Sequence, residues 1–408
     1  MNTLISLLAA IATPVGLSPG NDDLESDRVQ LLSGKELSGH AVYEDRKLVL
    51  LRKGSKVREI THDKIESVTS RARGIRTLMK ALDGYDAWRV SDNEALARQA
   101  EELGLQDEAH NLWWRVLAVE PENVTAHEAL GHKRSGKRWK VVHAGRKVRM
   151  DSVRELARDF GKAWEFSTSH FDLRTNLSLE QALDLTLDLE RLYVEFYRLF
   201  AHELRLFETE ERMQVYIHSD ASSFPEQSGE SGYFKGDLNR VTIDASKGLV
   251  MYLVVHEVTH QLIYNTAVEE HTRHGAIPGW VDEGLAEYMA GSYQGIPARL
   301  VIDTESLRHS WFRVQADAKK PLSLSRVLNL SGGDFAASSH RQLKYAQVYT
   351  LVCFCLQGQE GRYRKAFMLF LNGAYDGKGS STDFKSALAV KKKRFEEQWR
   401  GYVLQIAG

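Results

Sequence analysis

The chain has 408 residues, which is long for a single hydrophobic core and indicates two or three domains. Hydrophobic residues make up 43% of it and charged residues 27%, the usual proportions of a soluble globular protein. The 54 Lys and Arg nearly balance the 55 Asp and Glu, for a net charge of -1, so no overall field favours nucleic acid or an anionic membrane.

The N-terminal residues have features of a secretion signal. Residues 4–12 are apolar apart from Ser6, and Ala10-Ile11-Ala12 resembles a cleavage site, although no Lys or Arg precedes them. We expect a signal peptide over residues 1–19 and export from the cell; without a functional signal the protein would be cytoplasmic. Because no other apolar run reaches 18 residues, no stable membrane insertion is expected.

Residues 26–70 predict a small all-β, barrel-like module. Turn signals occur at Ser33-Gly34, Ser38-Gly39 and Lys53-Gly54, and short β-rich runs such as KLVLL lie between them. None of these residues indicates catalysis, so we expect a structural or accessory module.

Residues 71–149 predict a helical segment followed by a basic linker. The helical part resembles about one and a half tetratricopeptide repeats, too few for a solenoid, and we expect a helical hairpin with a possible protein partner. Residues 132–149 carry eight Lys and Arg but few aromatics, so a solvated linker is favoured over a nucleic-acid patch. The repeat pattern rests on Ala97, Gly104, Ala109, Trp113, Val116 and Pro121.

Residues 150–408 predict one larger domain, mostly helical with a small mixed sheet. An amphipathic helix ends near residue 204, residues 213–219 alternate like a strand, and residues 232–244 suggest a hairpin. A further helix is expected from about Lys247 to Tyr264. Cys353 and Cys355, the only cysteines, are expected to be two small buried side chains rather than a disulfide.

The stretch LVVHEVTHQLIYN contains an H-E-x-x-H motif. His256 and His260 are four residues apart, so on a helix both imidazoles lie on one face, one turn apart, and can hold one metal ion. Glu257 stands beside the first ligand, where it can take a proton from water. The alternative is an ordinary buried helix, but a buried carboxylate beside two imidazoles is costly unless a cation pairs with it.

A third metal ligand is expected downstream. The metzincin pattern requires glycine and histidine where this chain has Ile263 and Thr266, so that class is excluded. In the later helix IPGWVDEGLAEYMAG, Glu283 can complete three protein ligands. Glu287, one turn further, can accept a hydrogen bond from a ligand histidine.

The two motifs together, H-E-x-x-H and W-x-x-E-G-x-A-E-Y, resemble the gluzincin metallopeptidases, including uncharacterised bacterial proteins with a peptidase MA-like domain. The resemblance covers about residues 163–370. It implies an α+β fold with a mostly helical catalytic domain, one Zn²⁺ held by His256, His260 and Glu283, and Glu257 as general base. The G-x-M-E-N strand of aminopeptidases is absent, so the resemblance favours an endopeptidase acting on a peptide or protein substrate.

A donor to the oxyanion is expected on the helix that begins near residue 340. Tyr345 is the first candidate, with an ordinary aromatic packing stripe as the alternative, and Tyr349 and His340 are weaker candidates. His271 and His274 are expected to lie in a surface loop. Two other functions remain open: a weakly active zinc-binding relative that works through protein contacts, and a zinc hydrolase of a non-peptide bond.

Overall fold

The computed structural model describes residues 27–209, 211–225, 231–268, 277–292, 312–313, 315–316, 320–336 and 340–406. Helices and small sheets share the chain, so the predicted α+β fold is confirmed. The expected signal peptide, the loop with His271 and His274, and residues 293–311 lie outside the described residues. No described helix is long and apolar enough to cross a membrane.

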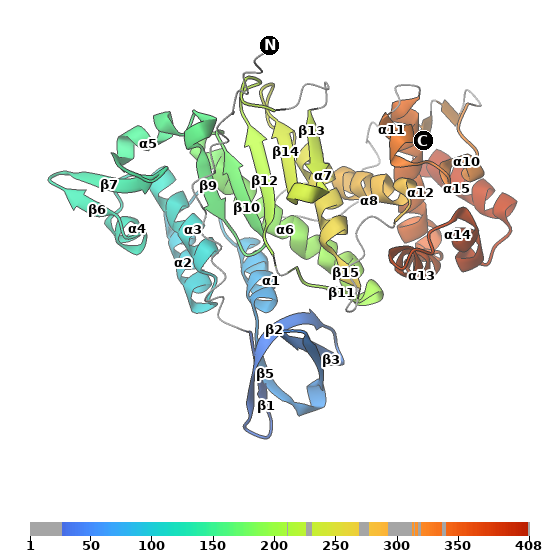
Figure 1. The fold of residues 1–408 in the computed structure, drawn as a ribbon, viewed down its shortest axis with the longest axis horizontal. Coiled ribbons are helices and arrows are strands. Elements are labelled where there is room, and N and C mark those ends of the chain that lie inside the picture. The colour runs from blue at the N-terminus through green and yellow to red at the C-terminus, as the bar shows by residue number, and fades with distance from the viewer. Residues whose placement is uncertain are drawn as a thin grey trace, which may run out of the picture.

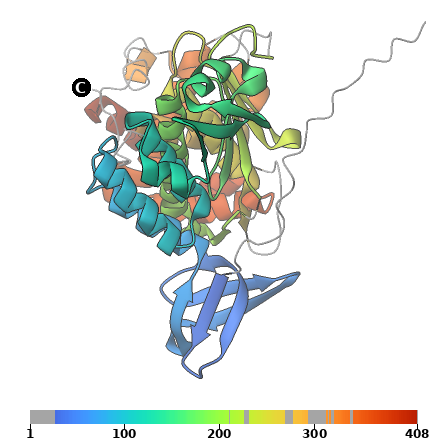
Figure 2. The ribbon, with the colours of Figure 1, turned by 90° about the vertical axis from the view of Figure 1, so that its left-hand side faces the viewer.

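The N-terminal residues form a five-stranded antiparallel sheet, which confirms the predicted β module. The strand order is β4-β3-β2-β1-β5, and the module lies at one end of the molecule (Figure 2). Its small core includes Val29, Val49, Leu51 and Ile60. The strands are β1 (Asp27–Leu31), β2 (Glu36–Glu44), β3 (Leu48–Lys53), β4 (Lys56–Thr61) and β5 (Ile65–Thr69).

Four helices follow, and two of them make the expected hairpin. Ser70 caps the first helix, since its side chain accepts a hydrogen bond from the Arg73 backbone N–H. The hairpin pairs α2 with α3 around a core that includes Leu96, Ala97 and Trp113. The helices are α1 (Arg71–Leu82), α2 (Val90–Glu102), α3 (Gln106–Val119) and α4 (Val124–Ala129).

The prediction of a basic linker after this hairpin was wrong. The segment forms a three-stranded antiparallel sheet, because its middle strand alternates: Trp139 and Val141 are buried while Arg138 and Lys140 are exposed. Trp139 stacks on His127 with ring centroids 4.2 Å apart. The strands are β6 (Lys133–Ser135), β7 (Arg138–His143) and β8 (Arg146–Arg149), and α5 (Met150–Leu156) follows.

A five-stranded mixed sheet forms the centre of the molecule (Figure 1). Its order is β13-β14-β12-β10-β9; β10, β12 and β14 run parallel, and the two edge strands run antiparallel to their neighbours. The predicted strand and hairpin are thus confirmed as β12 and as β13 with β14. The strands are β9 (Trp164–Ser167), β10 (Phe171–Thr175), β12 (Met213–His218), β13 (Gly232–Lys235) and β14 (Arg240–Asp244).

The long helix α6 (Leu179–Leu204) begins at a capping box formed by Ser178 and Gln181, and it buries the predicted apolar stripe. α7 (Met251–Asn265) starts four residues later than predicted and packs against β13 and β14. The short strands β11 (Leu206–Phe207) and β15 (Ala267–Val268) pair beside the ends of α6 and α7.

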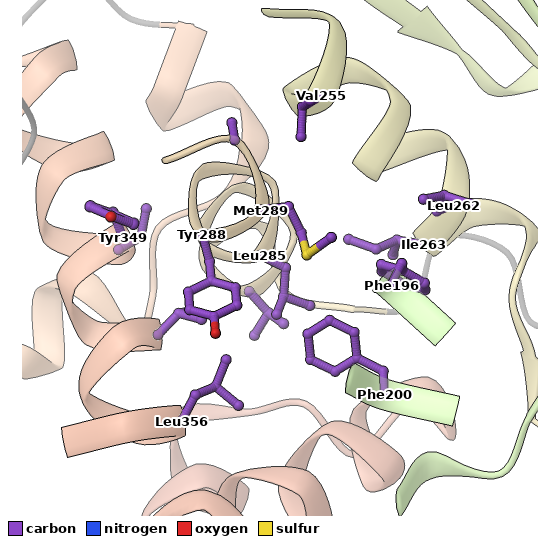
Figure 3. Packing of buried hydrophobic residues seen from close by; sticks show 14 of the residues in the cluster. Phe196, Phe200, Val255, Leu262, Ile263, Leu285, Tyr288, Met289, Tyr349 and Leu356 are labelled. Carbon is purple, nitrogen blue, oxygen red and sulfur yellow. The ribbon is translucent and has the colours of Figure 1, made fainter. Parts of the chain in front are cut away.

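The remaining helices form the C-terminal part of one large core cluster that also includes the central sheet. α8 lies between α7 and α12, and Leu285, Tyr288 and Met289 extend from it into the surrounding apolar side chains (Figure 3). Cys353 and Cys355 are both free and buried, as expected. The helices are α8 (Gly279–Ser292), α10 (Leu324–Val327), α11 (Gly332–Ala336), α12 (Arg341–Gly361), α13 (Arg364–Tyr375), α14 (Ser381–Leu388) and α15 (Lys392–Ile406).

Candidate metal centre

The helix that carries H-E-x-x-H is fixed to the sheet on its buried side. Val254, Val258 and Leu262 are buried, and the fully buried Gln261 donates to the backbone oxygens of Gln214 and Asn239 at 3.1 and 2.7 Å. These bonds tie α7 to the starts of β12 and β14. The opposite side of the helix therefore holds its histidines at a defined position next to α8.

A close approach of α8 to α12 places the third candidate ligand. A Cβ atom on Gly284 would lie 2.8 Å from Val352 Cγ2 and 3.3 Å from the Val348 carbonyl oxygen, so this contact requires glycine. Trp280, one turn before Gly284, is fully buried against Phe370 and Phe384. The E-G pair in the sequence thus combines a candidate ligand with the glycine that allows α8 to approach α12 closely.

Three possible ligand atoms meet between α7 and α8. His256 Nε2 and His260 Nε2 are 3.2 Å apart, and Glu283 Oε2 lies 3.4 and 3.6 Å from them. Among the described residues, this is the one group of three or more His, Cys, Asp or Glu that could hold a metal ion. Tetrahedral zinc with bonds of about 2.0–2.1 Å separates its ligand atoms by about 3.3–3.4 Å, which this triangle fits.

The carboxylate of this triangle lies between the two imidazoles. Glu283 Oε2 is buried, 3.4 and 3.6 Å from the two Nε2 atoms, and no contact there has hydrogen-bond geometry. A buried anionic oxygen needs a positive charge beside it, which protonated imidazoles or a metal ion can supply. The donor set, two imidazole nitrogens and one carboxylate oxygen, suits zinc.

The carboxylates of the cluster favour protonation of its two histidines. Burial opposes the charged form of His256, but the Glu283 and Glu287 carboxylates outweigh it and raise the pKa of His256 to about 9. Burial likewise opposes a charged His260, yet Asp282 and then Glu283 raise its pKa well above the ordinary value. Burial raises the pKa of Glu283 and the two histidines lower it, to a net value of about 2. A divalent cation would take the place of these protons.

Each histidine has a carboxylate near its other ring nitrogen. Glu287 Oε1 lies 3.3 Å from His256 Nδ1 without the geometry of the expected hydrogen bond, and Tyr252 donates to Glu287 Oε2 at 2.5 Å. Asp282 Oδ1 lies 3.0 Å from His260 Nδ1. Sequence reasoning missed Asp282 and Tyr252. Asp282 precedes Glu283 directly, and that position next to a ligand was the available signal.

The predicted proton-transfer and donor residues have different surroundings. Glu257 is partly exposed on α7, directly after His256. The ring of Tyr345 lies edge-on to His256 with centroids 6.0 Å apart, so it borders the cluster. Tyr349 is fully buried in the core, and His340 is exposed at the start of α12. Of the tyrosine and histidine candidates on this segment, the geometry favours Tyr345.

Comparison with known proteins gives a family match without an activity. A family model described as "Protein of unknown function (DUF1570)" matches residues 251–375, from the start of α7 to the end of α13. No curated protein matches the chain. The candidate metal centre and Tyr345 lie inside the matched segment, while the N-terminal modules and all five strands of the central sheet lie outside it.

Proposed function

We propose that this protein is a zinc-dependent peptide-bond hydrolase, and more specifically an exported endopeptidase. The observation that carries the proposal is the triangle of His256 Nε2, His260 Nε2 and Glu283 Oε2, with edges of 3.2–3.6 Å. Glu257 directly follows His256 on the same helix and is the carboxylate we assign to proton transfer. The combination matches the requirements of metal-assisted hydrolysis.

In this proposal the metal ligands, Glu257 and Tyr345 each have a separate role in hydrolysis. A zinc ion held by these three ligands would polarise the scissile carbonyl and lower the pKa of water. Glu257 takes the proton from the attacking water and passes it to the leaving amine. Tyr345 donates a hydrogen bond to the developing oxyanion; burial, and then the charge of Glu283, raise the pKa of Tyr345 and keep its hydroxyl protonated.

The edge of the central sheet suits an extended substrate. β13 is an edge strand and packs beside α7, and its side chains are partly exposed. An extended peptide can pair with such an edge through backbone hydrogen bonds, with its scissile bond toward α7. A site that holds the backbone of a long peptide favours cleavage within a chain, which supports endopeptidase over aminopeptidase action.

The proposal is tested with Glu257→Gln. The variant keeps the ligands, so it should bind zinc as the wild type does, but peptide cleavage should fall by about 10²–10⁴-fold because the proton acceptor is lost. Cleavage of a mixed peptide library is followed by mass spectrometry, and zinc content is measured on the same samples. Internal fragments identify an endopeptidase.

Glu397→Gln serves as the control for the loss of one carboxylate. Glu397→Gln removes an exposed carboxylate on α15 and should leave both zinc content and cleavage unchanged. Equal cleavage by wild type and Glu257→Gln would refute the mechanism. Zinc binding without cleavage by the wild type would favour a weakly active relative that works through protein contacts. Hydrolysis confined to non-peptide bonds would favour a zinc hydrolase of another substrate class.

A further inference from the structure

The three-stranded sheet β6-β7-β8 concentrates positive charge that the whole chain does not have. The net charge of the chain is -1, but residues 131–149 contain eight Lys and Arg and no Asp or Glu. All eight of these side chains are exposed. In Figure 1, β6 and β7 extend from the opposite end of the molecule from α12, so they are separate from the candidate metal centre.

The strand register gathers five of these cations on one side of the sheet. Along β7, Arg138, Lys140 and Val142 are exposed, and they alternate with the buried Trp139 and Val141. Residues directly opposite one another on paired strands share a side of the sheet. We call the outward side the basic face; it consists of Lys133, Arg138, Lys140, Lys147 and Arg149, with Val142 among them.

One cross-strand row of the basic face consists entirely of cations. Lys133 lies opposite Lys140, and Lys140 lies opposite Arg149. Like charges directly opposite each other in a sheet are unfavourable. Glu155 on the adjoining helix α5 does not relieve this repulsion, because it pairs with Arg158. A surface of negative charge placed against the face would relieve it.

The inner side of the sheet is packed, which holds the basic face in place. Trp139 is buried and stacks on His127 with ring centroids 4.2 Å apart. Val141 belongs to a buried cluster with Trp114 and Val153, and α5 contacts both β7 and β8. The cations are therefore presented on a supported surface.

We propose that the basic face docks on an anionic lipid bilayer. Its cations attract negatively charged headgroups, and Val142, which is 68% exposed in the middle of them, enters the apolar level just below those headgroups. The protein then lies on the membrane surface and does not cross it. The inference does not depend on zinc or on hydrolysis.

Other polyanions fit the basic face less well. Trp139 points inward and the face carries no aromatic side chain, so the bases of a single-stranded nucleic acid would find no ring on which to stack. A nucleic-acid duplex is bound mainly through its phosphates, which the exposed Val142 would not pair with. An acidic polypeptide would pair with the cations but leave this apolar centre without a partner.

Vesicle co-sedimentation of the full-length protein tests the proposal. The vesicles are phosphatidylcholine alone, or phosphatidylcholine with about 30% phosphatidylglycerol, in about 0.1 M salt. We expect roughly tenfold or more partitioning onto the anionic vesicles relative to the neutral ones, and loss of this excess at about 0.5 M salt, where exposed charges are screened. The apolar residues 4–12 would bind both kinds of vesicle alike, so the neutral vesicles give the baseline.

Two double variants assign the binding to the basic face. Lys133→Gln with Lys140→Gln should lower the partition coefficient on anionic vesicles roughly tenfold or more, because each cation near an anionic surface contributes. Its thermal midpoint should stay the same or rise, since both side chains are exposed and their repulsion is lost. Lys391→Gln with Lys393→Gln removes the same charge from exposed positions at the start of α15 and should change partitioning less than about twofold.

Four results would overturn the proposal. They are equal partitioning onto neutral and anionic vesicles, unchanged partitioning of the variant in the basic face, an equal loss in both double variants, and tighter binding of a DNA duplex or of polyglutamate than of anionic vesicles at the same concentration of negative charge. The last result would assign the basic face to a nucleic acid or an acidic polypeptide. None of the four bears on the metal centre, so this proposal and the hydrolase proposal can fail separately.

Discussion

At the scale of single residues, a carboxylate lies near Nδ1 of each histidine in the candidate metal centre. Asp282 forms a hydrogen bond with His260 at 3.0 Å, and Glu287 lies 3.3 Å from His256 without hydrogen-bond geometry. A carboxylate bonded to Nδ1 keeps the proton on that nitrogen and leaves Nε2 free for a metal ion. The ring of His260 is therefore oriented by Asp282.

Tyr345→Phe tests the proposed oxyanion donor. Removing the hydroxyl should lower kcat by about 10²–10³-fold, because one donor to the developing charge is lost, and it should leave zinc content unchanged. Tyr349→Phe is the matched control one turn along α12; Tyr349 is fully buried, so its loss should leave kcat close to that of the wild type. Steady-state kinetics on one cleaved peptide give both values. Full kcat in Tyr345→Phe would remove this residue from the mechanism.

At the scale of elements, the metal centre depends on how closely three helices pack. α8 contacts both α7, which carries the histidines, and α12, which carries Tyr345. The glycine at position 284 sets the distance between α8 and α12, and Glu283 immediately precedes it. A substitution that pushes α8 away from α12 should therefore displace the candidate ligand Glu283 as well as the core side chains of α8.

Gly284→Ala should destabilise the protein by about 1–3 kcal/mol, because the new methyl group overlaps Val352 and the backbone of α12. Zinc affinity should fall as Glu283 shifts. Gly401→Ala is the control, since a Cβ there meets nothing within 4 Å in α15, and it should be neutral or slightly stabilising. Denaturant unfolding of the two variants measures the difference. Equal stability would show that the contact tolerates a methyl group.

Elements with a strong hydrophobic period were predictable, and those defined by tertiary contacts were not. The stripe of α6 and the alternation of β12 identify a helix and a strand from local sequence alone. In β7 the cations concealed the alternation, because the buried residues Trp139 and Val141 stand between exposed Arg and Lys. For this strand, the alternation of apolar and charged residues indicated the structure better than the number of Lys and Arg did.

At the scale of the whole molecule, the candidate metal centre and the helical hairpin lie at opposite edges of one sheet. The candidate metal centre adjoins the β13 edge, and the hairpin α2–α3 contacts the β9 edge through α3. The clustering of His256, His260 and Glu283 could be predicted, because helical spacing places the two histidines on one face and the second motif offers a carboxylate. The contact of Asp282 with His260 was harder to predict, because it depends on how α8 packs against α7; only the position of Asp282 beside Glu283 indicated it.

The central claim is that the three ligands of the metal centre bind one zinc ion. The most direct test is the metal content of the purified protein after zinc loading and extensive dialysis, measured by mass spectrometry for the wild type and for Glu283→Gln with His260→Gln. We predict about one zinc ion per wild-type chain and almost none in the folded double variant. A wild type that takes up no zinc, or a double variant that retains it fully, would contradict the account.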